Sequence, residues 1–139
     1  MKVLLYVWQF PQLLVALILT LFTKSLEVSP RNDLPIKYYK NPLGRFGLSL
    51  SYIIFIPEKD NLSDKSYENL CRHEEGHTYQ SQMLGIFYLL LIGLPSVILF
   101  WRRRHKNYSM EWYHSHYPEE WADKLGHAYA YAKLDIAEP

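Results

Sequence analysis

The pentapeptide His73-Glu74-Glu75-Gly76-His77 is the feature that most constrains the fold of this chain. Two histidines four residues apart lie on one face of an α-helix, one turn from each other. Their imidazole nitrogens can therefore bind a single zinc ion from that face, with Glu74 beside the metal as a general base. The pattern requires a helix at this position and indicates metal-assisted hydrolysis.

The residues that precede the pentapeptide favour this helix. Ser63 or Asp64 is a suitable N-cap. Tyr67 and Leu70 follow at a helical spacing. Glycine inside a helix costs about 1 kcal/mol relative to alanine. We therefore expect that either helix packing or the site requires glycine at position 76.

A catalytic zinc ion of this type needs a third protein ligand and one position that is open to water. The elongated form of the motif, which carries a third histidine, is absent, so this ligand must come from later in the chain. We predict Glu119 as the ligand and Asp123, one turn further on, as the group that orients a ligand histidine. Glu120 and His116 are alternative ligands. The simplest alternative is an acidic first turn that offsets the helix dipole.

A family resemblance rests on these two motifs. The H-E-x-x-H of residues 73–77 and the E-x-x-A-D of residues 119–123 resemble the gluzincin-type membrane metallopeptidases, which include the CAAX-processing and the bacterial heat-shock membrane proteases. The resemblance implies a mainly α fold with a small β element, α+β and zincin-like, that binds one Zn²⁺ ion. It also implies the residue roles: His73, His77 and Glu119 as metal ligands, Glu74 as the base and Asp123 as the orienting carboxylate.

A second resemblance concerns the segment from His73 to Leu89. It is similar to a set of small bacterial membrane-associated proteins that share a His-Glu-x-Gly-His core, a following Gln-Ser and a Gly-x-x-Tyr-Leu. The Trp-Gln-Phe-Pro-Gln of residues 8–12 is also similar to that set.

Length and composition limit the classes of protein. The 139 residues fit one domain, and an aromatic content of 16% suits a membrane interface as well as an aromatic core. The formal net charge of +1 argues against nucleic acid as the main partner. The single cysteine, Cys71, excludes an internal disulfide, and we interpret it as a packing residue.

The N-terminal run predicts a membrane segment. Residues 3–22 contain no charged side chain and are long enough to cross a bilayer as a helix. We predict a transmembrane anchor over residues 1–23, because residues 23–25 offer no small-x-small site for signal cleavage. Gln9 and Gln12 would place the polar side of this helix against protein. Residues 24–139 would then form the zincin-like domain.

A second apolar run, residues 85–101, ends in the basic cluster 102–106 and lies between the histidines and Glu119. A simple crossing would leave the ligands on opposite sides of the membrane. The turn signal at residues 93–96 therefore predicts a re-entrant or interfacial helical hairpin, with a buried core helix as the alternative. The distribution of Lys and Arg predicts that the zinc site lies on or near the cytoplasmic face of a membrane. The resemblance to small bacterial proteins implies that this is a bacterial inner membrane.

The remaining segments complete the prediction. Residues 24–45 have no clear period and predict a loop, whereas residues 46–56 alternate and predict a strand that Pro57 ends. Residues 46–54 of that strand are suited to hold a substrate backbone by strand addition, and core packing would explain them equally well. Residues 118–136 predict a terminal amphipathic helix. The groups that could donate to a developing oxyanion, or else be surface aromatics, are Tyr113, His114, His116 and Tyr117.

The sequence thus predicts a membrane-associated zinc metallopeptidase that hydrolyses a peptide or protein substrate with a zinc-activated water. Two alternatives remain at this point: a non-catalytic zinc-binding protein, and a metal-free membrane interaction protein.

Overall fold

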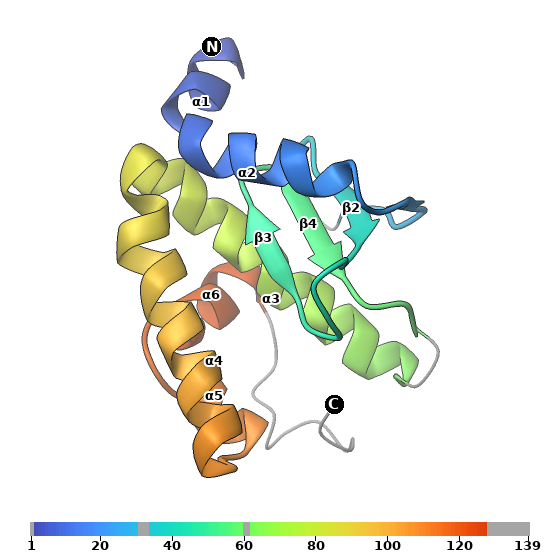
Figure 1. Cartoon of the computed structure of the whole chain (residues 1–139), viewed down its shortest axis with the longest axis vertical. Helices are drawn as coiled ribbons and strands as arrows, with labels where there is room; N and C mark the ends of the chain where they lie inside the picture. Colours follow the sequence, from blue (N-terminus) through green and yellow to red (C-terminus); the bar gives the residue numbers. More distant parts are fainter. Residues whose placement is uncertain (1, 31–33, 60–61, 128–139) are drawn as a thin grey trace.

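The computed structural model of the chain describes residues 2–30, 34–59 and 62–127 (Figure 1). It is mainly helical with one small sheet, as the sequence predicts. The helices are α1 (Lys2–Trp8), α2 (Phe10–Thr20), α3 (Asp64–Leu84), the 3₁₀ turn η2 (Gly85–Phe87), the π turn η3 (Leu89–Gly93), α4 (Leu94–Lys106), α5 (Met110–His114) and α6 (Glu119–Gly126). The strands are β1 (Ser25–Leu26), β2 (Lys37–Lys40), β3 (Leu48–Leu50) and β4 (Ile53–Ile56).

The sheet has the strand order β1-β2-β4-β3, with β2 and β4 parallel and the outer pairs antiparallel. The prediction of one strand over residues 46–56 is wrong, because the chain reverses between Leu50 and Ile53, which pair with each other. Ser51 adopts the left-handed φ of 58° that this turn needs. The sequence does not predict this turn, because residues 50–53 contain no Gly or Asn. The loop predicted over residues 24–45 likewise contains β1 and β2.

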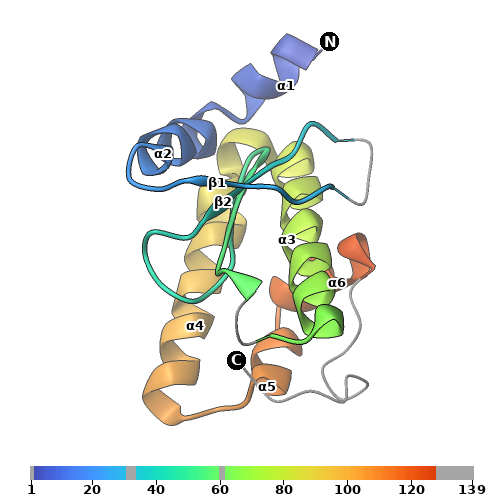
Figure 2. The ribbon, with the colours of Figure 1, turned by 90° about the vertical axis from the view of Figure 1, so that its right-hand side faces the viewer.

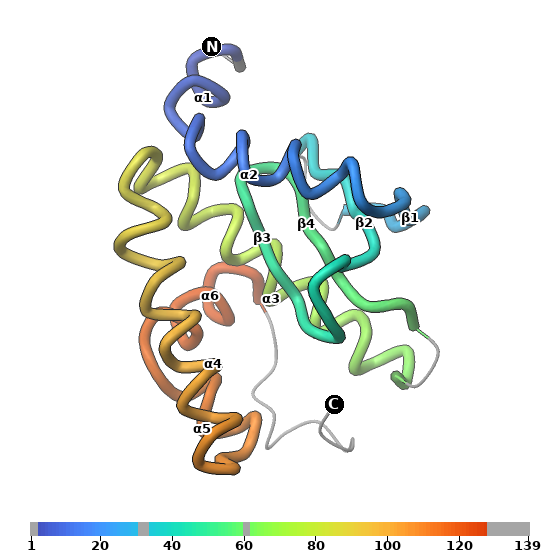
Figure 3. Tube along the Cα trace, in the orientation of Figure 1, coloured from blue at the N-terminus to red at the C-terminus, as the bar shows by residue number. Residues whose placement is uncertain are grey.

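The central strand β4 is covered on both faces, which explains its unbroken apolar sequence. On one face, Phe55 packs with Ala16 of α2 and with Ile92 of η3. On the other face, Ile54 packs with Cys71 of α3, so the cysteine is a packing residue as predicted. The tube in Figure 3 shows α2 crossing one face of the sheet and α3 running behind the other.

The N-terminal apolar run does not form the single helix that the sequence predicts. It breaks at Gln9, and the second helix, α2, begins at Phe10 with Pro11 in its first turn. The Gln12 amide donates to Ser81 Oγ (2.9 Å) and to the Gly85 carbonyl (2.8 Å), while Ser81 Oγ donates to Gln9 Oε1 (2.7 Å). The polar side of this segment therefore does lie against protein.

In the described part of the chain, no single helix is long and apolar enough to cross a membrane. One pair of helices passes that test together, by length and composition only: residues 64–87 and 89–106, which meet at a bend of 120°.

The second apolar run turns at a different place from the one predicted. The chain bends at Gly85, where φ is 53°, and residues 93–96 continue the helix into α4 instead of forming a turn. A side chain at position 85 would collide with the Trp8 ring, 1.9 Å away. The hairpin is thus formed by α3 and α4 together (Figure 2). Because α4 runs back along α3, the segment that follows it brings α6 into contact with α3, the helix that carries the histidines.

Candidate active site

Helix α3 carries an unusual set of buried polar side chains. It begins after Ser63, whose side chain caps the helix by accepting from the Ser66 N–H, and it contains the whole H-E-x-x-H motif. Most polar groups that face its neighbours have partners, as burial demands. The Tyr38 hydroxyl donates to Glu75 (2.6 Å), and Ser49 and Thr78 share a hydrogen bond of 3.2 Å.

Helix α6 lies against α3 at very short distance, and two glycines permit this. A Cβ atom at Gly76 would lie 1.8 Å from the Ala122 carbonyl oxygen, and one at Gly126 would lie 1.7 Å from the Arg72 carbonyl oxygen. The expectation that packing requires glycine at position 76 is confirmed. The predicted helix over residues 118–136 begins at Glu119 and is described as far as Gly126, and residues 128–139 lie outside the described part.

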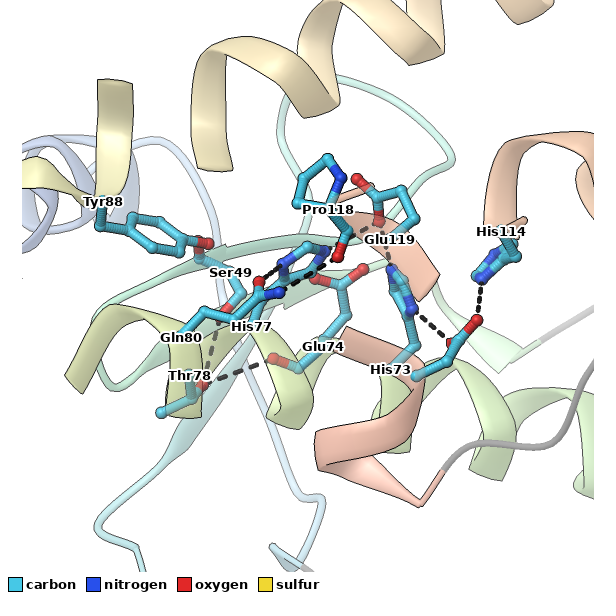
Figure 4. Close-up of polar contacts among 11 residues, drawn as sticks. Ser49, His73, Glu74, His77, Thr78, Gln80, Tyr88, His114, Pro118 and Glu119 are labelled. Atoms are coloured by element: carbon cyan, nitrogen blue, oxygen red, sulfur yellow. Dashed lines mark hydrogen bonds and ion pairs between the residues drawn. The ribbon is translucent and has the colours of Figure 1, made fainter. Parts of the chain in front are cut away.

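This close approach places Glu119, fully buried, opposite both histidines (Figure 4). Glu119 Oε2 lies 2.8 Å from His73 Nε2 and 2.9 Å from His77 Nε2. The three ligand atoms lie within 4.8 Å of one another, so His73, His77 and Glu119 could hold a metal ion. The other carboxylate oxygen of Glu119, Oε1, is buried without a hydrogen-bond partner among the described residues. A buried donor set with one unpaired oxygen fits a cation ligand site.

The outer ring nitrogens of the two histidines are both held as donors. His73 Nδ1 donates to Asp123 Oδ1 at 2.7 Å. His77 Nδ1 lies 2.6 Å from Gln80 Oε1, and the Gln80 amide group donates to the Pro118 carbonyl, which fixes the amide orientation. Both Nε2 atoms are therefore free to ligate in the neutral rings. Asp123 has the orienting position that the sequence predicts for it.

Burial and neighbouring charges shift the pKa values of the buried acids and histidines in this cluster. Burial alone would raise the pKa of Glu119, but His77 and His73 outweigh it and hold this pKa well below its usual range. Burial alone would lower the pKa of His73, but hydrogen bonds to Asp123 and Glu119 raise it well above 6.5. The pKa of His77 is raised by Glu119 in the same way, against burial. Despite burial, hydrogen bonds from His114 and His73 lower the pKa of Asp123 to about 2.

Glu74 differs from the other buried acids because its carboxylate has no hydrogen bond or ion pair with any described residue. Burial raises its pKa, against the opposing effect of the two histidines. Its carboxylate packs against the backbone at Gly47, where a Cβ would lie 2.1 Å from Oε1. Two adjoining pockets meet at Gly47, Glu74 and Tyr113, one towards His73 and the other towards His77. Glu74 is thus positioned to exchange a proton with a molecule in either pocket.

Several candidates from the sequence lie elsewhere. Glu120 is exposed and pairs with Lys124 at 3.0 Å, so Glu119 and not Glu120 faces the histidines. His116 is exposed and contacts the Trp112 carbonyl, away from the cluster. Tyr117 is 55% exposed and donates to the Leu91 carbonyl. Neither His116 nor Tyr117 lines the two pockets that meet at Glu74.

Two of the other oxyanion candidates do reach the pockets. His114 donates from Nδ1 to Asp123 Oδ2 at 2.8 Å, and burial together with the charge of His73 lowers its pKa. Burial and the charges of Glu119 and Glu74 raise the pKa of Tyr113 well above 10, so this phenol stays protonated. The sequence predicted no role for Gly47 or Gln80, although Gln80 belongs to the Gln-Ser pair of the second resemblance.

Comparison with models of known protein families, with curated proteins and with solved structures gives no match to this chain.

Proposed function

We propose that this protein is a zinc metallopeptidase of the gluzincin type that works at a membrane surface. The observation that carries the proposal is the convergence of His73 Nε2, His77 Nε2 and Glu119 Oε2 on one buried point, beside the unpaired carboxylate of Glu74. Two imidazoles and one carboxylate form the ligand set of catalytic zinc in peptidases, which leaves a position for water. Zinc bound there would lower the pKa of a water molecule to about 7 and polarise the substrate carbonyl.

Each remaining group supports one part of the reaction. Glu74 takes the proton from water and passes it to the leaving amine, a role that its raised pKa and its position in both pockets support. Asp123 and Gln80 keep Nδ1 of the two histidines protonated, so that each Nε2 faces the ion. Tyr113, which remains a hydroxyl donor, stabilises the negative charge that develops on the carbonyl oxygen.

The pocket towards His77 provides a place for a substrate, and residues 48–50 of β3 line it. Strand addition to β3 is blocked, because Ser49 and Leu50 are buried and the Ser49 carbonyl accepts from the Tyr88 hydroxyl at 2.9 Å. A substrate in this pocket would lie beside Gly47, where the missing side chain leaves room next to the Glu74 carboxylate. Core packing, the alternative that the sequence offered for residues 46–54, therefore accounts for β3.

The test begins with the metal content of the purified protein, measured by elemental mass spectrometry. We expect about one zinc ion per chain, lost in His77→Ala and kept in the matched control His116→Ala. Glu119→Gln should weaken zinc binding strongly, because a neutral amide replaces a buried anionic ligand, whereas Glu120→Gln should not. A chain that holds no metal after zinc is supplied would refute the proposal and leave the metal-free interaction protein.

Catalysis needs a separate measurement. We expect Glu74→Gln to keep its zinc and to lose peptide hydrolysis, because the amide cannot accept the proton. If the wild-type chain binds zinc in this site but cleaves no peptide in a mixed peptide library, the non-catalytic zinc protein replaces the peptidase.

We also propose that one side of the molecule lies on an anionic bilayer. In Figure 2, α2 and α4 both lie on the left-hand side, and both expose large apolar side chains. These are Phe10, Leu14, Leu17, Ile18 and Leu21 near α2, and Leu90, Leu94, Val97, Ile98 and Trp101 along η3 and α4. The last turn of α4 adds the exposed basic residues Arg102, Arg104 and Lys106, which suit anionic headgroups.

Vesicle sedimentation tests this surface. The chain should bind vesicles of phosphatidylcholine mixed with phosphatidylglycerol more tightly than phosphatidylcholine alone. The double variant Arg102→Gln/Arg104→Gln should lose most of this preference, and the exposed Lys65→Gln should keep it. Equal binding by both variants would refute the assigned surface. The bacterial inner membrane and its cytoplasmic face stay predictions of the sequence.

A further inference from the structure

The pocket towards His73 differs chemically from the pocket towards His77. Two guanidinium groups, those of Arg45 and Arg103, line it, and Glu74 is the only acidic lining residue in the described part of the chain. The pocket towards His77 is lined by no arginine or lysine from that part. The other walls of the pocket towards His73 are largely apolar, and they include Phe46, Leu62, Leu70, Phe100 and Met110. A substrate that reaches into both pockets therefore meets positive charge on one side of the metal ligands only.

The position of Arg103 on α4 brings its side chain to this pocket. The arginines on either side of it lie elsewhere, because Arg102 is exposed and Arg104 lies over the Phe100 ring at 5.7 Å. Phe100, one turn before Arg103, also packs against Phe46, with 5.0 Å between the ring centroids. This contact holds the loop before β3 against α4 and forms one wall of the pocket.

The positive charge in the pocket has no partner in residues 2–30, 34–59 and 62–127. Among these residues, neither Arg45 nor Arg103 forms an ion pair or a side-chain hydrogen bond. The Nε atom of Arg103 is buried, and a buried guanidinium N–H without an acceptor is unfavourable. An anionic group in the pocket would supply this acceptor through a charge-assisted hydrogen bond.

The size and the walls of the pocket indicate what kind of anion fits. Its volume is about 90 Å³, small beside the roughly 300–1,000 Å³ of pockets that hold drug-sized ligands. It therefore suits one side chain, and its apolar walls favour a side chain with methylene groups below the charge. Because His73 and Glu74 also line the pocket, a side chain bound there belongs to a residue next to the bond that is cleaved.

We propose that this pocket binds an acidic side chain of the substrate, so that the enzyme cleaves peptides beside glutamate. Arg103 donates to the carboxylate, Arg45 adds positive charge, and the apolar walls contact the methylene groups. The inference rests on the proposed function for its choice of a peptide. Binding itself needs neither the metal nor a free end of the peptide, because the two arginines are not metal ligands and the anion is a side chain.

The first experiment measures binding to the full chain in the presence of a metal chelator, because a zinc ion would bind carboxylates directly. The probes are acetyl-alanyl-glutamyl-alanyl-alanine amide and the same peptide with glutamine in place of glutamate, with isothermal titration as the readout. The two peptides have blocked ends and differ in one charge. We expect the glutamate peptide to bind at least ten-fold more tightly.

Variants of α4 assign this preference to the pocket. Arg103→Gln should reduce the ratio of affinities to within two-fold, and Arg103→Lys should keep part of it, because lysine retains the charge without the planar fork. Arg102→Gln is the matched control, since it removes one charge from the same turn outside the pocket and should leave the ratio unchanged. If Arg103→Gln does not fold, which its thermal unfolding would reveal, Arg45→Gln gives the same comparison with a smaller expected loss.

Three results would overturn the proposal. The first is equal affinity for the two peptides, and the second is no binding of the glutamate peptide at millimolar concentration. The third is inorganic phosphate that binds as tightly as the glutamate peptide, because the pocket would then be a general anion site.

The second experiment separates this inference from the peptidase itself. With hydrolysis established, we expect the zinc-loaded chain to cleave the glutamate peptide with a kcat/KM at least ten-fold above that of the glutamine peptide, and Arg103→Gln to remove this preference. Equal cleavage of both peptides would keep the peptidase and reject the acidic subsite. Glutamate-selective binding without any hydrolysis would keep the subsite and reject the peptidase.

Discussion

Replacing Gly76 by alanine tests the link between helix packing and the metal ligands. Helix propensity alone predicts that the change stabilises α3 by about 1 kcal/mol. The structure predicts the opposite sign, because the new Cβ would lie 1.8 Å from the Ala122 carbonyl oxygen, where contacts under 3.0 Å essentially never occur. Helices α3 and α6 would have to separate by about 1.2 Å.

Two consequences of this separation can be estimated. Overpacking of this kind costs about 1–3 kcal/mol, and for a domain of this size a net loss of about 2 kcal/mol lowers the melting temperature by roughly 5–10 °C. Metal–ligand distances tolerate deviations of only about 0.2 Å. Glu119 lies on α6 and both histidines lie on α3, so the shift should also weaken zinc binding by at least ten-fold.

The assay is thermal unfolding with and without zinc, together with zinc titration of Gly76→Ala. Gly93→Ala is the matched control, because its Cβ would meet Leu89 at an ordinary contact distance of 3.5 Å. We expect that control to be neutral or slightly stabilised, with unchanged zinc affinity. A Gly76→Ala variant that is as stable as Gly93→Ala and binds zinc normally would refute the close approach of α3 and α6 as the cause of the site geometry.

Three further predictions follow from the electrostatics. The lowered pKa of Asp123 stabilises the metal-free chain fully above the unfolded pKa of 3.8, and this stabilisation is lost as the pH falls towards about 2. Asp123→Asn should therefore lower the free energy of unfolding by about 2 kcal/mol at pH 6. Near pH 2, urea titrations should show little difference between the variant and the wild type. Asp123 and Glu119 raise the pKa of His73, and Glu119 raises that of His77, so zinc must displace protons from these rings. The apparent zinc affinity should therefore rise with pH above 6.5, and calorimetry in buffers of different ionisation enthalpy should detect the released protons. Tyr113→Phe should lower kcat by about 10²–10³ with little change in zinc content; an unchanged kcat would remove Tyr113 from the reaction.

Local patterns in the sequence were sufficient for several elements. The N-cap at Ser63 and the spacing of the two histidines identified α3, and the four-residue step from Glu119 to Asp123 placed a ligand and its orienting partner on one helix. These features depend only on the 3.6-residue period and on capping, which short windows of sequence contain. The β-branched run of β4 identified a strand for the same reason.

Long-range packing decided what short windows could not show. The turn at Ser51 uses a left-handed residue that no sequence signal marks. The break at Gln9 and the bend at Gly85 depend on distant partners, which are Ser81 and Trp8. The selection of Glu119 over Glu120 is of the same kind, because both are acidic residues at the start of α6 and only the contact with α3 determines which one is buried.

The sequence by itself therefore determined the chemistry of the candidate site: two histidines on one helical face, a glutamate beside the first, and a carboxylate pair one turn apart on a second helix. The tertiary structure alone decided that these helices meet, that Glu74 is left without a partner while its neighbours are paired, and that Arg45 and Arg103 share a pocket with it. The physical reason is that periodicity and capping act within a few residues, whereas burial, pKa shifts and pocket composition arise from segments that lie far apart in the chain.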